Sequence, residues 1–433
     1  MKDMSIKLGP LTIKSPFVSA AGPVAGTAKH IMNCADAGFG AVITKTTSYF
    51  KEFQRYPRTR FFLFDHRVTA REPHGHRLEE FSWMHTEHNS VYPPNKFVNI
   101  IKESASYCED RNCLLIGSFA GAGLAQWEEM ALNYVEAGAK ALELNFCCPY
   151  PQVMSEAATG CEHQIGQTFG DNPDLGIDVI KRLKELVKVP LFPKMPPTSR
   201  RQIMDIARKY KEAGADGITM YANSMVLKID IETADPLGWG AAIGGSHGHM
   251  MDTLSDVART AKEVPGLAIM AGRGARYWSD AIEFLMAGAS GCQYSIAVMV
   301  NGLGYVNRML TDIDRWLDRK GYNCLAEVQG LALPKIYRPA EIREKVKPLY
   351  AQVDAKTCIA CGKCEDACWY DAAVLKVKHG KGAAVIAKDH CVGCTACSQL
   401  CPVAAVSLHE RTEEEYLKSL VSAHPDLVPD ILA

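Results

Sequence analysis

Short apolar runs alternate with longer amphipathic stretches between residue 15 and about residue 318. Apolar runs bounded by turn residues are typical of buried strands, and apolar positions that recur every three or four residues indicate helices packed against them. Eight runs have these features. The strands they predict are Pro16–Ala20, Ala41–Thr46, Cys113–Phe119, Ala141–Phe146, Pro190–Met195, Gly217–Ala222, Leu267–Gly272 and Gly291–Ser295.

Helical periodicity fills most of the intervals between these runs, and several of the helices end at a Gly, as helices often do. The alternation predicts an α/β fold, a closed (β/α)₈ TIM barrel over residues 1–320, rather than an open doubly wound sheet. An open dinucleotide-binding sheet would carry G-x-G-x-x-G after a strand, and Gly121-Ala-Gly123 lacks the third Gly. The predicted helices include Glu128–Ala137, Leu175–Val187, Arg200–Ala213, Met251–Val264 and Ser279–Ala287.

One connection, over residues 47–112, is unusually long and rich in aromatic, Arg and His residues. An insertion of this length after a barrel strand is more often a lid or subdomain over the active face than a disordered loop. Its histidines form no H-x₃-H pattern on a clear helix, so we interpret them as solvated loop side chains rather than metal ligands. They are His66, His74, His76, His85 and His88.

The C-terminal part contains two cysteine runs with the spacing C-x₂-C-x₂-C-x₃-C, the second followed by Pro402. This spacing is typical of two [4Fe–4S] clusters, each run giving its fourth Cys to the other cluster. Zinc sites and disulfides are weaker alternatives, because zinc sites usually pair Cys with Cys or His and disulfides do not persist in a reducing cytosol. The predicted ligand sets are Cys358, Cys361, Cys364 and Cys401 for one cluster, and Cys391, Cys394, Cys397 and Cys368 for the other.

The same part divides into three segments. Pro334, Pro339 and Pro348 with mixed charges indicate a linker over residues 321–349, and a ferredoxin-like domain follows over residues 350–409. Residues 410–433, which begin with several charged side chains, predict a helical tail.

Composition narrows the class of protein. With 433 residues and 47% hydrophobic content the chain can bury a large core in two or three domains. A net charge of -1 gives no reason to expect nucleic acid or an anionic membrane as partner. No apolar run approaches the roughly 20 residues that span a bilayer, the first ten residues lack an apolar core, and the other cysteines form no disulfide framework. We therefore expect a cytoplasmic protein.

Chemically meaningful residues gather where the predicted strands end, which is the active face of a barrel. Lys45-Thr46 ends the second strand, Asn145 and Cys148 the fourth, and Lys194 the fifth. A lysine in a barrel mouth requires an anionic partner, either a barrel carboxylate or the electron-rich edge of a reduced flavin. Cys148 is the candidate acid–base, since a thiol with a pKa near 8.5 exchanges protons near neutrality; a buried inert thiol is the alternative, and it suits Cys147 and Cys161.

Glycine-rich loops after the later strands suggest a phosphate site. Gly272-Arg273-Gly274 and Ser295-Ile-Ala297 follow strands seven and eight, the usual phosphate position in this fold, and Gly244 to Gly248 offer further close backbone approach. Together with iron–sulfur clusters they indicate a phosphorylated redox cofactor. FMN is the simplest, because a flavin accepts hydride and returns electrons singly.

The chain resembles the dihydroorotate and dihydropyrimidine dehydrogenase family over nearly all of its length, and most of all the iron–sulfur subunits of the bacterial NAD-dependent dihydropyrimidine dehydrogenases. The motifs that carry the resemblance are Ser15-Pro-Phe, Thr44-Lys-Thr46, Leu142-Glu-Leu-Asn145, Cys148-Pro149, Ala215-Asp-Gly217 and both cysteine runs. Four positions depart from the family pattern: Cys147 stands for Ser, Asn223-Ser224 for Asn-Thr, His247 for Ser, and Arg273-Gly274 for Gly-Gly.

The resemblance implies roles for individual residues, with Cys148 as the acid–base. The implied FMN contacts are Ala20, Lys45, Thr46, Lys194, Gly248, Gly274, Ser295, Ile296 and Ala297, and the implied substrate contacts are Asn99, Asn145, Cys147, Asn223 and Ser224.

We therefore expect an FMN- and iron–sulfur-dependent oxidoreductase that reduces, or forms, a polarised C=C bond in a pyrimidine-like ring. Hydride would pass from the flavin while Cys148 protonates the neighbouring carbon. Because the chain has no nicotinamide fingerprint, a separate FAD- and NAD(P)H-binding subunit is expected, and we also expect an oligomer. The alternatives are the same chemistry on dihydroorotate or another cyclic enone, and a non-catalytic electron-transfer subunit.

Overall fold

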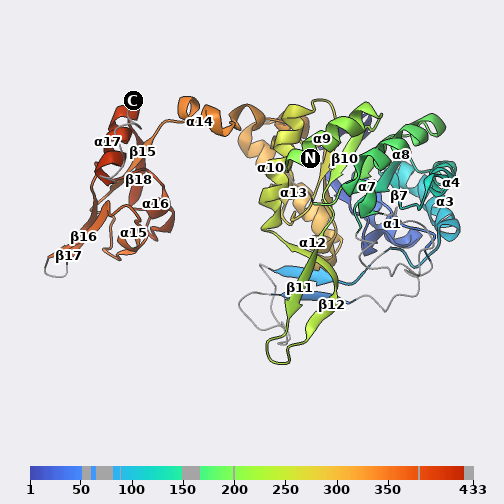
Figure 1. The fold of residues 1–433 in the computed structure, drawn as a ribbon, viewed down its shortest axis with the longest axis horizontal. Coiled ribbons are helices and arrows are strands. Elements are labelled where there is room, and N and C mark those ends of the chain that lie inside the picture. Colours follow the sequence, from blue (N-terminus) through green and yellow to red (C-terminus); the bar gives the residue numbers. More distant parts are fainter. Residues whose placement is uncertain are drawn as a thin grey trace. The chain divides into compact units, whose positions relative to one another are not determined.

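The computed structural model describes residues 1–50, 60–64, 81–87, 89–148, 166–197, 200–378 and 381–423. They form two compact units, Met1–Lys335 and Ile336–Ala433. Figure 1 shows the first unit as a ring of strands and helices and the second as small sheets with short helices. No helix in the described part of the chain is both long and apolar enough to span a bilayer.

The first unit is a closed eight-stranded parallel barrel in which the neighbour order is β10-β13-β14-β3-β4-β7-β8-β9. All eight predicted strands are confirmed as strands of this barrel. Their interiors are buried on both faces, which is why they appear in the sequence as continuous apolar runs rather than as alternating ones. The strands are β3 (Phe17–Ser19), β4 (Ala41–Ile43), β7 (Leu114–Phe119), β8 (Ala141–Asn145), β9 (Leu191–Lys194), β10 (Gly217–Met220), β13 (Ala268–Ala271) and β14 (Gly291–Tyr294).

Amphipathic helices cover the outside of the barrel (Figure 1). In the first of them the Thr27 side chain accepts a hydrogen bond from the His30 N–H, and the helix then buries Ile31 and Cys34. The helices are α1 (Ala28–Asp36), α3 (Pro94–Asp110), α4 (Leu124–Glu136), α7 (Gln167–Asp171), α8 (Pro173–Leu186), α9 (Arg200–Glu212), α10 (His249–Glu263), α11 (Trp278–Met286), α12 (Ile296–Asn301) and α13 (Gly304–Lys320).

The segment after α13 packs on the barrel instead of leaving it. Leu325 and Val328 in the 3₁₀ helix η2 (Leu325–Val328) are fully buried, and the Leu325 N–H donates to the carbonyl of Asp3, beside the N-terminal hairpin β1 (Ile6–Leu8) and β2 (Leu11–Ile13). The first unit therefore continues past residue 320 to Lys335. Residues 321–335, which were predicted to begin the linker 321–349, belong to the first unit instead. The rest contains η3 (Leu333–Lys335) and α14 (Pro339–Lys345).

A four-stranded antiparallel sheet, here called the lid sheet, is built from two insertions in the order β11-β12-β6-β5. β5 (Phe61–Phe64) and β6 (Ser82–His85) follow β4, whereas β11 (Ser224–Ile229) and β12 (Pro236–Ser246) follow β10. The predicted insertion 47–112 thus supplies only half of this sheet. Its last part is α3, a barrel helix, and the second insertion was not predicted. One face of the sheet buries Phe64, Met84 and Ala242 as a small core of its own.

The second unit contains two antiparallel strand pairs. β15 (Leu349–Val353) pairs with β18 (Val406–Glu410), and β16 (Ala373–Lys378) pairs with β17 (Lys381–Ile386). The short helices α15 (Lys363–Asp366) and α16 (Ala396–Leu400) lie within the two cysteine runs and contain Cys364 and Cys397, and α17 (Glu413–Ala423) follows both runs. The buried Arg411 side chain donates to Ser419 of α17 and to the Cys391 carbonyl, so it ties that helix to the cysteine-bearing loops.

Candidate active site

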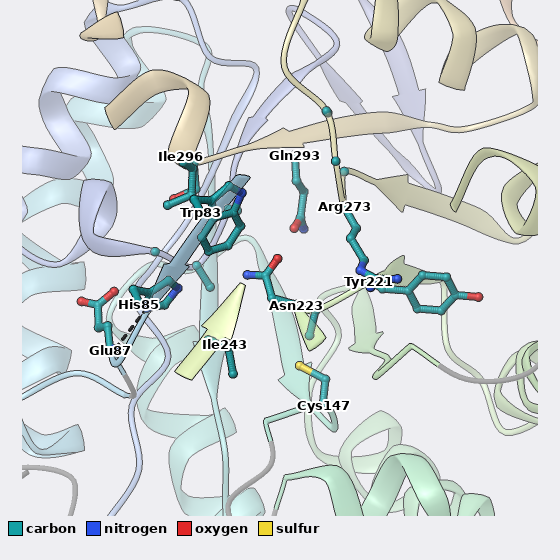
Figure 2. A pocket seen from close by; sticks show the side chains of 18 of the residues that line it. Trp83, His85, Glu87, Cys147, Tyr221, Asn223, Ile243, Arg273, Gln293 and Ile296 are labelled. Carbon is teal, nitrogen blue, oxygen red and sulfur yellow. Dashed lines mark hydrogen bonds between the residues drawn. The ribbon is translucent and has the colours of Figure 1, made fainter. Parts of the chain in front are cut away.

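A pocket lies where the barrel strands end. It encloses about 1240 Å³, a volume that includes the part open to solvent. Figure 2 shows Asn223 between Arg273 and Tyr221 on one side and His85 and Glu87 on the other. The sequence-predicted residues that the structure brings to this pocket are Ala20, Lys45, Thr46, Asn145, Cys147, Cys148, Lys194, Asn223, Gly274, Ser295, Ile296 and Ala297.

Three predicted residues do not line the pocket. Gly248 is exposed just before α10, and the Ser224 hydroxyl instead accepts a 2.6 Å hydrogen bond from Arg273. Asn99 is exposed in the middle of α3, and Asn89 lines the pocket in its place, buried and donating to the Ser48 hydroxyl at 2.9 Å. The signal was available, because prolines 93 and 94 mark the start of a helix. Asn99 then falls inside the helix, and Asn89 falls in the loop before it.

Asn145, the last residue of β8, organises the loop that carries both cysteines. Its Nδ2 group lies 3.1 Å from the Cys148 sulfur and 3.1 Å from the Thr46 hydroxyl. Its Oδ1 atom accepts from the backbone N–H groups of Cys147 and Cys148 and from the Cys147 thiol. One buried amide therefore fixes where the Cys148 sulfur sits.

The two cysteines differ in environment. Cys147 is fully buried, and burial, with the neighbouring Cys148 thiol, raises its pKa well above the usual value, so it is a neutral thiol. Cys148 is partly exposed at the pocket wall. Both line the pocket, and Cys148 is the more exposed of the pair. Cys161 lies outside the described residues.

Lys194 ends β9 and faces a carboxylate inside the barrel. Its Nζ atom lies 3.7 Å from Oε1 of the fully buried Glu143, which also accepts hydrogen bonds from Ser118, Thr219 and Gln293. Burial lowers the pKa of Lys194, but the attraction of Glu143, with Cys147 and Cys148, outweighs it and the pKa is raised. Lys194 is therefore a cation at the floor of the pocket, and Glu143 is a site residue that sequence reasoning missed.

Lys45 is also paired. Its Nζ atom lies 3.2 Å from the Glu87 carboxylate, and the two side chains are only 10% and 16% exposed. Glu87 comes from the loop after β6, so the partner belongs to the lid sheet rather than to a barrel strand. A barrel-mouth salt bridge was the alternative to a flavin contact for this lysine, and the structure shows that a carboxylate is present.

His85 is buried in the pocket wall, so its interpretation as a solvated loop side chain was wrong. Its Nδ1 atom accepts a hydrogen bond from the Glu87 N–H at 3.0 Å (Figure 2). The available signal was the alternation of Phe81, Trp83, His85 and Glu87, which is typical of a strand with one face buried. His66, His74, His76 and His88 lie outside the described residues.

The loop after β13 brings a cation to the opposite side of the pocket. Burial lowers the pKa of the Arg273 guanidinium below its usual range. Its Nε atom is buried and makes no hydrogen bond to any described residue. A desolvated guanidinium with an unused donor fits an anionic group such as a phosphate, which would supply the missing acceptor.

The cysteines of the second unit surround two separate cavities of about 360 and 340 Å³ including their open parts. Among the described residues, no three His, Cys, Asp or Glu side chains are placed to hold a single metal ion. A zinc site would bring its sulfurs within about 3.8 Å of one another, so four cysteines around a cavity fit a cluster better. One cavity is lined by Cys368, Cys391, Cys394 and Cys397, and the other by Cys358, Cys361, Cys364 and Cys401.

Backbone N–H groups point at several of these sulfurs. Ala372 donates to Cys368 at 3.3 Å and Ala405 to Cys401 at 3.2 Å, four residues on in each case. The pKa of Cys401 is lowered by backbone hydrogen bonds, chiefly that of Val403. These hydrogen bonds therefore favour the thiolate, which is the form that binds iron.

Comparison with known families decides the class of the barrel. Residues 95–317 match the model of the dihydroorotate dehydrogenase family, and residues 351–408 match a 4Fe-4S dicluster domain. The chain belongs to the dihydroorotate dehydrogenase family. This family consists of FMN-binding oxidoreductases, and the second unit is a ferredoxin-like domain for iron–sulfur clusters.

Relatives within this family differ in length. The NAD-dependent dihydropyrimidine dehydrogenase subunit PreA of Escherichia coli (strain K12) is 28% identical over 423 residues, which cover 94% of this chain and 96% of the relative. The catalytic subunit of dihydroorotate dehydrogenase B (NAD(+)) from Methanothermobacter thermautotrophicus is 29% identical over 329 residues, 74% of this chain and 96% of the relative. The PreA subunit thus matches both units of this chain.

A solved structure of the family confirms the barrel. Dihydroorotate dehydrogenase (DHODH) from Eimeria tenella in complex with ferulenol superposes with a TM-score of 0.60 at 17% identity, over 76% of this chain and 88% of that one. At this identity the likeness concerns the fold alone.

Proposed function

We propose that this chain catalyses reduction of a C=C bond in a pyrimidine-like ring, or its reversal, with Cys148 as proton donor and acceptor. The observation that carries the proposal is the Cys148 thiol, held at the pocket wall by the Asn145 amide at 3.1 Å and opposite the lid sheet. Ring reduction adds hydride to one carbon and a proton to its neighbour. A positioned thiol can deliver that proton, which in the reverse direction it takes up.

FMN would bind in the pocket at the ends of the barrel strands. Lys194 and Lys45 would lie along the flavin edge, Arg273 with the Gly272–Ala275 backbone would hold the phosphate, and Ala20, Ile296 and Ala297 would contact the ring system. Bound there, FMN supplies hydride transfer and single-electron exchange with iron–sulfur clusters.

The substrate ring would be held by amides and closed off from water by the lid sheet. Asn89 and Asn223 offer both donors and acceptors for the carbonyl and N–H edges of a cyclic amide. Asn145 lies beside them in the pocket wall and orients Cys148.

Two [4Fe–4S] clusters would occupy the two cysteine-lined cavities, with the fourth ligand of each exchanged between the runs. Electrons would reach them from a separate FAD- and NAD(P)H-binding subunit. The likeness to a subunit of a dihydropyrimidine dehydrogenase described as NAD-dependent supports such a partner.

The test is to purify the chain anaerobically, identify its flavin, and measure dihydrouracil oxidation with an artificial electron acceptor. Cys148→Ala should lower turnover about 10²–10⁴-fold without loss of flavin, the range for a lost general acid. Cys324→Ala, outside the pocket, is the matched control. Undiminished turnover of Cys148→Ala would exclude the assigned acid, and a chain that binds iron but never a flavin would exclude the proposed reaction.

Dihydroorotate is the second candidate substrate. It is supported by the likeness of the barrel to dihydroorotate dehydrogenase B. The same assay with dihydroorotate separates the two candidates.

A further inference from the structure

Strand β6 and the residues flanking it form one wall of the pocket. Successive residues of a strand point to opposite faces, and Phe81, Trp83, His85 and Glu87 all line the pocket. The intervening Met84 is buried in the core of the lid sheet. The register of this wall is therefore fixed, because a slip by one residue would move Met84 into the pocket and the charged Glu87 into an apolar core.

Three neighbouring side chains of this wall are aromatic rings. The His85 ring is stacked between Phe61, with centroids 5.0 Å apart, and Trp83, at 5.3 Å with an interplanar angle of 10°. Gly245 lies opposite Trp83 in the β6–β12 pairing and has no side chain to cover the indole. Such a wall suits a planar ring.

The backbone near Glu87, at one end of this wall, is tied to neighbouring segments by hydrogen bonds. On one side the Thr86 N–H donates to the Arg60 carbonyl at 3.1 Å, and on the other the Ser90 N–H donates to the Thr46 carbonyl at 2.8 Å. The Glu87 N–H itself is bonded to His85. These bonds hold the backbone near Glu87, and its carboxylate forms an ion pair with Lys45 at 3.2 Å.

This arrangement changes what charge the pocket accepts. Lys45 is neutralised by Glu87, and Lys194 by Glu143. Arg273 lies on the other side of the pocket, in the loop assigned to phosphate (Figure 2). A ring carboxylate placed near Lys45 would face a second carboxylate in a desolvated site, whereas an uncharged cyclic amide could donate its N–H to Glu87.

We propose that Glu87, held against Lys45 by strand β6, makes the pocket select uncharged cyclic amide rings and reject rings that carry a carboxylate. The inference rests on the proposed function, because it assumes that a pyrimidine-like ring enters this pocket, and it assigns the choice between the two candidate substrates to one residue of the lid sheet.

Binding of uracil and orotate tests it. Each is titrated into the oxidised, FMN-loaded full-length chain and followed by the change in the visible flavin spectrum. We expect wild type to bind uracil at least about 100-fold more tightly than orotate, and Glu87→Gln to reduce that ratio at least about tenfold, mainly by tighter orotate binding. Glu87→Asp keeps the charge and should keep the ratio within about threefold.

Glu136→Gln removes the same charge from an exposed position on α4 and should leave the ratio unchanged. A ratio that Glu87→Gln does not alter beyond twofold, a wild-type preference for orotate, or no binding of either ring would overturn the inference. If the ratio shifts as expected but dihydrouracil and dihydroorotate both fail to reduce the flavin, the inference stands and the proposed reaction fails.

Discussion

The buried pair of Glu143 and Lys194 makes a quantitative prediction about the stability of the barrel. Glu143 is fully buried, and Lys194 Nζ is 3.7 Å away with a side chain only 12% exposed. At an effective dielectric constant near 20 their gross attraction is about 4.5 kcal/mol. Glu143→Gln removes the attraction and leaves Lys194 as an uncompensated buried cation.

Part of the lost stabilisation is offset, because the neutral amide costs less to bury than the carboxylate and its oxygen can still accept a hydrogen bond. We therefore expect Glu143→Gln to lower the free energy of unfolding by about 3 kcal/mol, at the lower end of the 3–5 kcal/mol typical for a broken buried pair. The pKa of Lys194 should also fall, because burial then acts without the opposing carboxylate.

Urea denaturation of the full-length chain, followed by tryptophan fluorescence of the barrel, measures the effect. A double-mutant cycle with Lys194→Met should give a coupling energy of about 2–3 kcal/mol, since the second substitution removes the stranded cation. Glu109→Gln breaks the 3.3 Å surface pair with Lys140, both half-exposed or more, and should cost at most about 0.5 kcal/mol. A loss below about 1 kcal/mol for Glu143→Gln, or no coupling to Lys194, would refute this reasoning.

Three further predictions concern the pocket and its rim. Asn145→Ala removes the contacts that hold Cys148 and should reduce turnover at least about 10²-fold with flavin content unchanged, and normal turnover would contradict a positioning role. Arg273→Ala removes the guanidinium assigned to the FMN phosphate and should weaken FMN binding at least about tenfold in equilibrium dialysis. Wild-type affinity for FMN in this variant would show that Arg273 does not hold the phosphate. Burial and the charge of Arg273 lower the pKa of His249 in the folded chain. As the pH falls below 6.5, His249 is therefore protonated more readily in the unfolded chain, and the folded state loses stability. His249→Gln should flatten the fall of the urea midpoint between pH 6.5 and about pH 5, and an unaltered slope would exclude His249 as its source.

The sequence by itself determined the barrel strands and predicted which cysteines line each of the two cavities of the second unit, because both follow from short-range patterns. Each barrel strand is a short buried run, and each cysteine run has the fixed spacing that is typical of iron–sulfur ligands. Lys45, Asn145, Cys148 and Lys194 could be found in the same way, since they stand where strands end and such ends meet at one face of a barrel.

Only the tertiary structure decided the lid sheet and the charges inside the pocket. β6 pairs with β12, far along the chain, and nothing local in either strand specifies that partner. The partnership of Glu87 with Lys45 depends on that pairing, and the choice of Asn89 over Asn99 depends on where α3 begins. Pairings between distant segments are selected by the shared burial of whole surfaces, which is a property of the folded chain and has no counterpart in the spacing of neighbouring residues.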